Sequence, residues 1–476
     1  VYNRTQTRRS FLWWENAAVP VNEEYELFFP PDVHFVQFHY RKNVTSFPIA
    51  RGVYNGIRMG EGVDIRLHRN TRQPTSYFSA GSHYDFFGGY DHGRQAGVVH
   101  VADPHVSVGK KMFTWAYGQL ASSWERALTD EDGMYAELMA GSYSANQPDF
   151  AWLEPYEEKS FSQCWYPIGA LGIPLCATLD AAVAVREGEI RLQATRELVD
   201  ASLDIRDKRY CIHAAPGEIV RFPFAGEVGE LALCDAQGRT LLLYCPAEER
   251  PQAVPAPLAE LPALDQLANA QDAYRAGVHV AQYRDPIRSP ERYWQEALRF
   301  DAGHAETHQE LSRHCYEHLR YEEALSHALS AWEAVTRYNF HPLSGDIPYL
   351  AGLALEALNR DAEAEDWHQK AAWAQDARSR AMVRLAMIAG RRKDYAAMER
   401  YARQALEAHA PNGTAAACLA LALWRQGKAG EAKETLRHRL AHDPLDKLCG
   451  LLLVALEGRA AGRLPAAGSG GPKQAG

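Results

Sequence analysis

The stretch GGYDHGRQAGVVHVADPH, residues 88 to 105, gathers three histidines and two aspartates within eighteen positions. Imidazole and carboxylate side chains bind metal ions and transfer protons, so such a stretch can serve either chemistry. His100 alternates with Val98 and Ala102 along a predicted strand, and the stretch contains neither an HxH nor an HxxxH pair. We therefore predict a buried, hydrogen-bonded His100, and we expect the chain to hold neither a metal ion nor another cofactor.

Aromatic side chains are concentrated in the same part of the chain. Residues 1–170 hold 30 of the 50 Phe, Trp and Tyr residues. An indole face packs well against the apolar face of a sugar ring, and its N–H can reach a hydroxyl. Most of these tryptophans are expected in the core, because a β domain needs their buried area. Trp14 and Trp115 are the two that we predict to line a carbohydrate cleft.

The pattern of the chain changes twice. Short alternating runs such as AGVVHVAD, broken by Gly, Pro and Asn, predict an antiparallel β domain over residues 1–170, with no long amphipathic helix in it. Further strands over 177–247 predict a small β-sandwich. A proline-rich linker follows at 248–265, and a low-complexity tail that we expect to be disordered occupies 461–476.

Residues 266–460 are rich in Ala, Leu, Glu and Arg at the spacing typical of helices, and they contain a repeat. Two ladders of positions step by 34 residues, with a single step of 40 in each: Ala297, Ala331, Ala371, Ala405 and Arg439, and Ala324, Ala364, Met398 and Ala432. The step of 40 exceeds the period by six residues, and these fall near RYNFHPLSGDIP, which predicts a longer loop there. This period resembles tetratricopeptide repeats (TPRs), which implies stacked helix pairs that bind a protein partner or mediate self-association.

Composition limits the classes of partner. The 476 residues carry a net charge of −9 without a strongly basic segment, which argues against nucleic acid and anionic membranes as partners. No apolar run approaches the length of a membrane span. The eight cysteines form no CxxC pair, which favours a reducing, cytoplasmic compartment. Because the chain begins VYNRTQ, in what reads as the interior of a strand, we expect it to be a fragment or a processed product.

Motifs near the end of the β domain resemble galactose-mutarotase-like proteins. In YAELMAGSYSANQPDFAWLEPYEEKSFSQCWYPI, residues 135–168, Glu137 takes the place of the family's catalytic glutamate, and Pro148-Asp149 that of the Pro-Asp that follows it. Tyr90-Asp91-His92 resembles the family's Asp-His motif. FLWWENAAV lies where the first histidine motif would fall, but it contains no histidine, which puts an unchanged mutarotase mechanism in doubt.

Together with FPPDVHFV and GVVHVADPH, these motifs resemble a bacterial family of uncharacterised mutarotase-fold domains that precede TPRs. The resemblance implies a multidomain chain, β then α, with the C-terminal part of a mutarotase-like β-supersandwich, a small β-sandwich and an α-helical TPR solenoid. It implies that the N-terminal half of the supersandwich is missing from this chain. It also implies a carbohydrate site with the catalytic candidates Glu137, Asp91 and His92 and the substrate-binding candidates Trp14, Asn16, His34, Trp115 and Asp149.

Two classes of function remain open. The chain is either a carbohydrate-active enzyme, similar to glycoside hydrolases or epimerases, or a non-catalytic carbohydrate-binding scaffold protein. An enzyme needs one group that takes a proton and another that gives one. Under the second alternative, Glu137 is a strand residue in a salt bridge and Asp91 caps a turn.

Overall fold

The computed structural model describes residues 1–39, 43–79, 81–129, 132–147, 149–246 and 253–458, which form two units. The first, here called the β unit, contains Ser10–Ala151 and Ser160–Leu261. The second, the helical unit, contains Pro262–Gly476 together with two short upstream segments, Val1–Arg9 and Trp152–Lys159. A β-rich part thus precedes a helical part, which confirms the predicted order. The predicted tail 461–476 lies outside the described residues.

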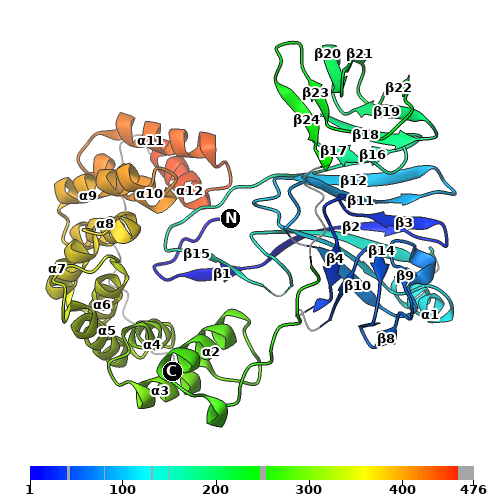
Figure 1. Ribbon diagram of the computed structural model, residues 1–476. Helices are drawn as coiled ribbons and strands as arrows, with labels where there is room; N and C mark the ends of the chain where they lie inside the picture. Colours follow the sequence, from blue (N-terminus) through cyan, green and yellow to red (C-terminus); the bar gives the residue numbers. More distant parts are fainter. Residues whose placement is uncertain (40–42, 80, 130–131, 148, 247–252, 459–476) are drawn as a thin grey trace, which may run out of the picture. The chain divides into compact units, whose positions relative to one another are not determined.

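A six-stranded antiparallel sheet forms the first layer of the β unit (Figure 1). Its strands are, in spatial order, β2 (Trp13–Pro20), β14 (Tyr135–Ser142), β13 (Gly109–Thr114), β10 (Thr75–Ser79), β4 (Phe35–Gln37) and β5 (Val44–Ser46). Along β14, Ala136, Leu138 and Ala140 are fully buried in a hydrophobic core. Because side chains alternate along a strand, the other residues of β14 point to the opposite face, here called the outer face.

The second layer is a four-stranded antiparallel sheet with the order β16 (Gln163–Ile168), β12 (Ala96–Ala102), β11 (Phe86–Asp91) and β3 (Tyr25–Phe28). Leu27 of β3 and Phe87 of β11 share the core that contains Leu138, so the two sheets pack face to face. One helix, α1 (Gln119–Leu128), follows β13 in the chain. This ten-residue helix could not be predicted from the sequence, because its short amphipathic pattern lies between strongly strand-like runs.

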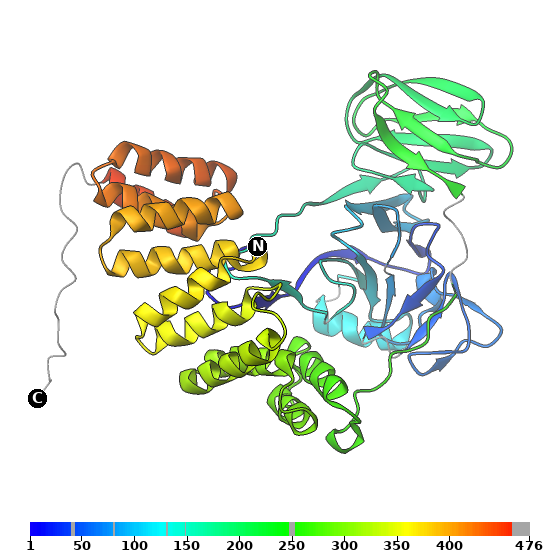
Figure 2. The same ribbon diagram turned by 60° about the vertical axis from the view of Figure 1, so that its left-hand side comes forward.

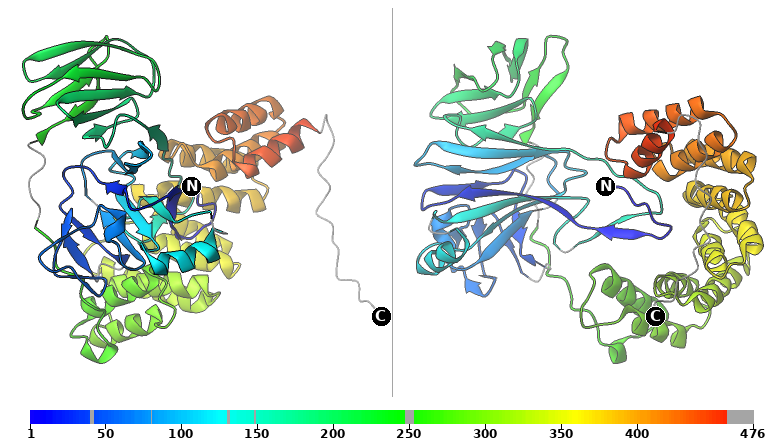
Figure 3. Two further views of the ribbon diagram at one scale, coloured as in Figure 1. Left: turned by 90° about the vertical axis from the view of Figure 1, so that its right-hand side faces the viewer. Right: turned by 180° about the vertical axis from the view of Figure 1, so that it is seen from behind.

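Two further four-stranded sheets follow in the chain (Figure 3, green). They contain β17 (Cys176–Ala177), β18 (Ala181–Arg186), β19 (Glu189–Ala194) and β22 (Ile219–Pro223), and β21 (Lys208–Ala214), β20 (Leu198–Ile205), β23 (Leu231–Cys234) and β24 (Thr240–Tyr244). Their common core includes Val183, Leu192 and Leu203, and it continues into β11 and β12 through Phe86 and Val99. These strands are therefore packed into the β unit.

The helical unit is a series of antiparallel helix pairs (Figure 2). Its helices are α2 (Ala270–Gln282), α3 (Pro290–Phe300), α4 (Ala305–Glu317), α5 (Tyr321–Thr336), α6 (Asp346–Ala357), α7 (Asp361–Ala371), α8 (Gln375–Arg391), α9 (Tyr395–Ala408), α10 (Gly413–Arg425), α11 (Ala429–His442) and α12 (Lys447–Glu457). The longer loop that the sequence predicts lies between α5 and α6, where Tyr338, Phe340 and Leu343 are exposed.

The repeated positions have a common structural role. Ala324, Ala364, Met398 and Ala432 are each the fourth residue of the second helix of a pair, and all four are buried. A small or slender side chain at this position allows the neighbouring helix to approach closely. The 34-residue period thus marks successive helix pairs, which confirms TPR-like repeats.

Candidate functional site

The outer face of the six-stranded sheet carries a cluster of polar side chains that includes the predicted residues Glu137 and Asn16. Glu137 lies on β14, and its neighbour across the strand pair on β13 is Phe113. Asn16 on β2 and Lys111 on β13 both pair with Met139, so all of these side chains point to the same face. Three strands distant in sequence therefore bring a carboxylate, an amide and an amine to one surface.

Glu137 is half-buried and hydrogen-bonded. The amide Nδ2 of Asn16 donates to Oε2 of Glu137 across 3.3 Å. Burial raises the pKa of Glu137, and the charge of Lys111 and a hydrogen bond with Tyr135 lower it only in part. A carboxyl group with a raised pKa takes up and releases protons closer to neutral pH than an ordinary glutamate does.

Lys111 lies fully buried at the centre of the cluster. Its ammonium Nζ donates to Nε2 of His39 and to Oε1 of Gln147, each at 2.7 Å. Burial lowers the pKa of Lys111 to about 7, although the charge of Glu137 acts in the opposite direction. Burial and the charge of Lys111 also lower the pKa of His39, so its imidazole is neutral and its Nε2 can accept the hydrogen bond from the Lys111 ammonium.

Two tryptophans frame this cluster. The indole of Trp14 lies across the glycines of the neighbouring strands, since a Cβ at Gly141 or Gly109 would approach its ring atoms to 2.6 or 2.8 Å. The Lys111 ammonium is 5.8 Å from the ring centre of Trp14. Trp115 packs against Phe113 and Trp124, with centroid separations of 4.9 and 4.7 Å.

The indole N–H group of each of these two tryptophans is buried. Among the described residues, neither the Nε1 of Trp14 nor that of Trp115 has a hydrogen-bond partner, although both atoms are buried. Buried N–H groups are normally paired, so these two donors are unusual, and a ligand hydroxyl could reach them only if the surrounding side chains moved.

Three residues of this cluster were missed in the sequence analysis: His39, Lys111 and Gln147. The sequence signal that could have identified Lys111 is the lysine pair in GKKMFTW. Consecutive lysines in a central strand place one charge on each face of the sheet. Lys110 indeed points to the core side, where Asp32 and Asp85 interact with it. His39 and Gln147 come from loops, and nothing in their local sequence links them to Lys111.

Asp91 and His92 belong to a different part of the β unit. Asp91, at the end of β11, is buried and accepts a hydrogen bond from Nδ2 of Asn22 at 2.7 Å. His92 Nε2 lies 2.8 Å from Oε2 of Glu26. β11 belongs to the second sheet, across the core from the outer face, so the structure does not bring Asp91 and His92 together with Glu137, and their catalytic role stays a prediction.

The remaining predicted residues are dispersed. His34 precedes β4, and its buried Nε2 has no hydrogen-bond partner among the described residues. Asp149 lies in the loop after β14, where its backbone N–H donates to the carbonyl of Asn146. Pro148 of the Pro-Asp motif lies outside the described residues. The roles of His34 and Asp149 in ligand binding stay predictions.

His100 is the buried histidine that the sequence predicts. Its Nε2 lies 3.1 Å from Oε1 of Gln163, and its ring packs on Trp165 with a centroid separation of 4.7 Å. Burial lowers the pKa of His100 to about 4, so the ring is neutral at physiological pH. Within the polar stretch at residues 88 to 105, His100 therefore has a structural role.

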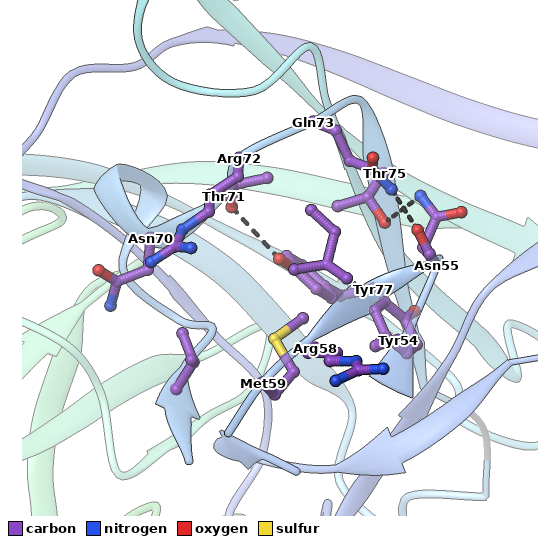
Figure 4. Close-up of a pocket in the computed structure, with 12 residues that line it drawn as sticks. Tyr54, Asn55, Arg58, Met59, Asn70, Thr71, Arg72, Gln73, Thr75 and Tyr77 are labelled. Atoms are coloured by element: carbon purple, nitrogen blue, oxygen red, sulfur yellow. Dashed lines mark hydrogen bonds between the residues drawn. The ribbon is translucent and has the colours of Figure 1, made fainter. Parts of the chain in front are cut away.

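A small cavity lies elsewhere in the β unit, next to the hairpin of β7 (Val53–Tyr54) and β8 (Ile57–Arg58) (Figure 4). Tyr77 and Thr71 meet there through their hydroxyl groups, 3.2 Å apart. Its volume is about 20 Å³, which is enough for a water molecule and too small for a sugar ring.

The helical unit has a second candidate surface, the inner side of its curve, where Val1–Arg9 and Trp152–Lys159 lie (Figure 1). Tyr156 is buried in a cluster with Tyr349 of α6 and Leu353, and its hydroxyl lies 3.3 Å from Nη1 of Arg384. The Tyr349 hydroxyl in turn donates to the carbonyl of Gln6 at 2.9 Å. Tyr156 of the segment 152–159 and Tyr349 of α6 thus pack in one cluster on this inner side of the repeats.

Ion pairs fix the same two segments along the repeats. The pairs, with their N···O separations, are Arg4–Asp446 (3.2 Å), Arg8–Glu310 (3.3 Å), Arg9–Glu317 (3.4 Å), Glu154–Arg380 (2.5 Å) and Glu158–Arg439 (2.5 Å). The first segment contributes cations and the second contributes anions, so the helices present complementary charges to each. The inner side of the repeats therefore holds two non-helical segments, and both are part of the same chain.

Comparisons with known proteins find matches to parts of the chain and, for one solved structure, to nearly all of it. Residues 1–168 match the family model of a domain of unknown function (DUF5107). Among solved structures, a TPR-domain protein from Parabacteroides distasonis is 12% identical over 98% of this chain and 68% of its own, with a TM-score of 0.27. YrrB, described as a TPR protein with an unusual peptide-binding site, is 16% identical over 39% of this chain and 91% of its own, with a TM-score of 0.33.

The type IV pilus biogenesis factor PilW is 18% identical over 40% of this chain and 89% of its own, with a TM-score of 0.34. None of the helices in the described ranges has both the length and the apolar content that a membrane crossing requires.

Proposed function

We propose that the outer face of the β unit binds a carbohydrate and that Glu137 transfers a proton to or from it. The observation that carries this proposal is the joint environment of Glu137 and Lys111. Their pKa values are shifted toward each other, that of the carboxyl group upward and that of the ammonium group down to about 7. Opposed shifts of two nearby groups are typical of acid/base sites.

The arrangement favours epimerase-like proton transfer over hydrolysis by two carboxylates. Glycoside hydrolysis generally uses a second carboxyl group across the substrate from the first. The groups that the structure gathers around Glu137 are instead the Asn16 amide and the Lys111 amine. In an epimerase-like reaction, Glu137 would accept a proton from a sugar hydroxyl, and the buried charge of Lys111 would keep the Glu137 carboxylate ionised until it does so. The resemblance to mutarotase-like domains supports the same assignment.

The test uses the full chain with a panel of monosaccharides, oligosaccharides and aryl glycosides, and follows anomeric exchange by NMR and products by chromatography. Glu137→Gln should lose at least about 100-fold in turnover while ligand binding persists. Glu61→Gln, a substitution at an exposed turn of the β unit, is the matched control and should keep full activity. Equal turnover in wild type and Glu137→Gln would refute the catalytic role.

The alternative is a non-catalytic carbohydrate-binding protein, and the same panel distinguishes it. Glycan binding without turnover in the wild type, unchanged by Glu137→Gln, would support a binding module. The indole N–H groups of Trp14 and Trp115, which have no hydrogen-bond partner among the described residues, are compatible with either function. All eight cysteines are free thiols, which supports a reducing, cytoplasmic location as part of the proposal.

A second function is favoured by the inner side of the repeats. We propose that this side recognises a peptide with an aromatic anchor and flanking charges, and that residues 1–9 and 152–159 serve as its ligand in this chain. A fluorescent peptide of sequence VYNRTQTRR should bind a variant that lacks residues 1–9 more than tenfold tighter than it binds the full chain. Replacing Tyr2 and the three arginines of the peptide by Ala gives the control, and equal affinities for both proteins would refute occupation in cis.

A further inference from the structure

The outward face of the sheet β21–β20–β23–β24 carries three metal-binding side chains at one point. Cys211 and His213 are two residues apart on β21, so both point to the same side, away from buried Ile212 and Ala214. Asp200 comes from the adjacent strand β20. Side-chain ligand atoms of all three lie within 4.8 Å of one another.

The distances fit a shared ion. Sγ of Cys211 lies 3.5 Å from Nε2 of His213, and Oδ1 of Asp200 lies 3.5 Å from the same nitrogen. Zinc bonds of about 2.3 Å to sulfur and about 2.0 to 2.1 Å to nitrogen and oxygen give ligand-to-ligand separations of roughly 3.3 to 3.6 Å at tetrahedral angles. Two of the three ligand separations thus already match those of a zinc tetrahedron, and the third, between Cys211 and Asp200, lies within 4.8 Å.

The strand geometry at Asp200 is unusual and brings its carboxylate to this point. The pairing of β20 with β21 shifts between Leu198 and Ala201, and Asp200 within this bulge has a φ of 51°. Left-handed backbone at a non-glycine residue costs free energy, and β-bulges commonly redirect a side chain. A regular strand would alternate without placing this carboxylate beside His213.

The same trio does not have the geometry of a nucleophilic cysteine site. Such a site needs the thiol at one ring nitrogen of the histidine and the carboxylate at the other. Here the thiol and the carboxylate both face Nε2 of His213, and the backbone N–H of Asp200 is the group 3.5 Å from Nδ1. Convergence on Nε2 does not fit a proton relay. Coordination through Nε2 requires the ring proton to be on Nδ1, so the long Asp200 N–H to Nδ1 contact would be given up when the ion binds.

We propose that Asp200, Cys211 and His213 bind a divalent zinc-like ion, with the remaining position open to water or to a ligand from a partner. Thiolate, imidazole and carboxylate together suit zinc better than they suit calcium or magnesium, which prefer oxygen ligands alone. The site is exposed and has three protein ligands, which is the composition of an open rather than a closed zinc site. The proposal departs from the expectation, drawn from the sequence, that the chain holds no metal ion. The Cys-x-His spacing of Cys211 and His213 is the sequence signal that could have suggested the site.

The test titrates the metal-stripped full chain with Zn²⁺ against a chromophoric chelator, and with Co²⁺ to observe thiolate-to-cobalt absorption in the near ultraviolet. The wild type should bind one equivalent tightly enough to compete with the chelator. Cys211→Ala and His213→Ala should each weaken zinc binding by at least about tenfold, and Cys211→Ala should abolish the cobalt–thiolate band. All three side chains are exposed, so circular dichroism should show each variant folded.

Cys234→Ala is the matched control, because Cys234 lies on β23 of the same sheet and is not part of the trio. It should leave zinc affinity and the cobalt band unchanged. A Cys211→Ala variant that binds zinc as the wild type does would overturn the proposal, as would a wild type that takes up no zinc at micromolar concentration.

Discussion

At the scale of single residues, the outer face depends on a lysine that is out of water and close to a carboxylate. Burial disfavours the charged forms of both Lys111 and Glu137, while each charge stabilises the other. Desolvation exceeds this attraction for both groups, since the pKa of Glu137 is raised and that of Lys111 is lowered. The pair can therefore exchange protons with a ligand at a smaller energetic cost than two exposed groups could.

Removing the lysine charge should change the titration of its neighbour. In Lys111→Met, the pKa of Glu137 should rise further, because the positive charge that partly offsets its burial is gone. Carbon-13 NMR of the glutamate carboxyl groups measures this shift. Lys110→Met is the control: Lys110 points to the opposite face, and its loss should leave the Glu137 titration unchanged. A Glu137 pKa that stays constant in Lys111→Met would contradict the electrostatic coupling.

The buried lysine should also make stability depend on alkaline pH. The folded-state pKa of Lys111, about 7, is below its unfolded value, so between these values the unfolded chain binds more protons and stability rises with pH. Each unit of separation is worth about 1.4 kcal/mol at most. Urea unfolding of wild type and Lys111→Met from pH 7 to 10 tests this. The variant should gain less stability with pH; parallel curves would show that Lys111 is not the source.

At the scale of the elements, two glycines allow an indole to lie on the sheet. Gly109 on β13 and Gly141 on β14 are opposite each other, and the ring of Trp14 from β2 covers both. A side chain at either glycine would occupy the space of the ring. The flat indole surface next to Asn16 and Lys111 thus depends on residues that have no side chain.

Gly141→Ala should displace this indole. The new Cβ would meet the Trp14 ring at 2.6 Å, and overpacking of this kind costs about 1 to 3 kcal/mol. Urea unfolding and tryptophan fluorescence measure the loss of stability and the change in indole environment. Gly169→Ala is the matched control, since its nearest atom would be 3.9 Å away and its stability should be almost unchanged. Equal stabilities for the two variants would contradict the packing argument.

At the scale of the whole molecule, chain segments far apart in sequence complete the helical unit. Residues 1–9 and 152–159 lie against helices that begin more than 100 residues later, and Tyr156 fills part of their core. Their interactions combine a buried aromatic anchor with ion pairs on both sides. Because the anchor is fully desolvated and the flanking pairs are only partly so, most of the binding free energy should come from Tyr156.

Tyr156→Ala should therefore release these segments. Truncation of a buried aromatic side chain costs about 3 to 5 kcal/mol, and hydrogen–deuterium exchange of residues 1–9 and 152–159 should accelerate by 100-fold or more. Tyr338→Ala, in the exposed loop after α5, is the control and should leave that exchange unchanged. Unchanged protection in Tyr156→Ala would show that the segments are held by other contacts.

The amino-acid sequence by itself determined the features that repeat locally. The 34-residue ladder located the helix pairs, because each pair must cover the apolar face of the next. Alternation along β12 identified His100 as a buried residue, because neighbouring side chains of a strand point to opposite faces. Both rules act within a few residues, or between neighbouring repeats, and so they leave a direct record in the order of residues.

Only the tertiary structure decided which side chains meet. His39, Lys111 and Glu137 come from three segments, and their contact depends on strand order and loop paths that no local pattern encodes. The same holds for Asp200 and His213, which a bulge brings together, and for Tyr156 in the repeats. Interactions across long sequence separations are set by the packing of whole sheets and helices, and for this reason the candidate sites became visible only in the folded chain.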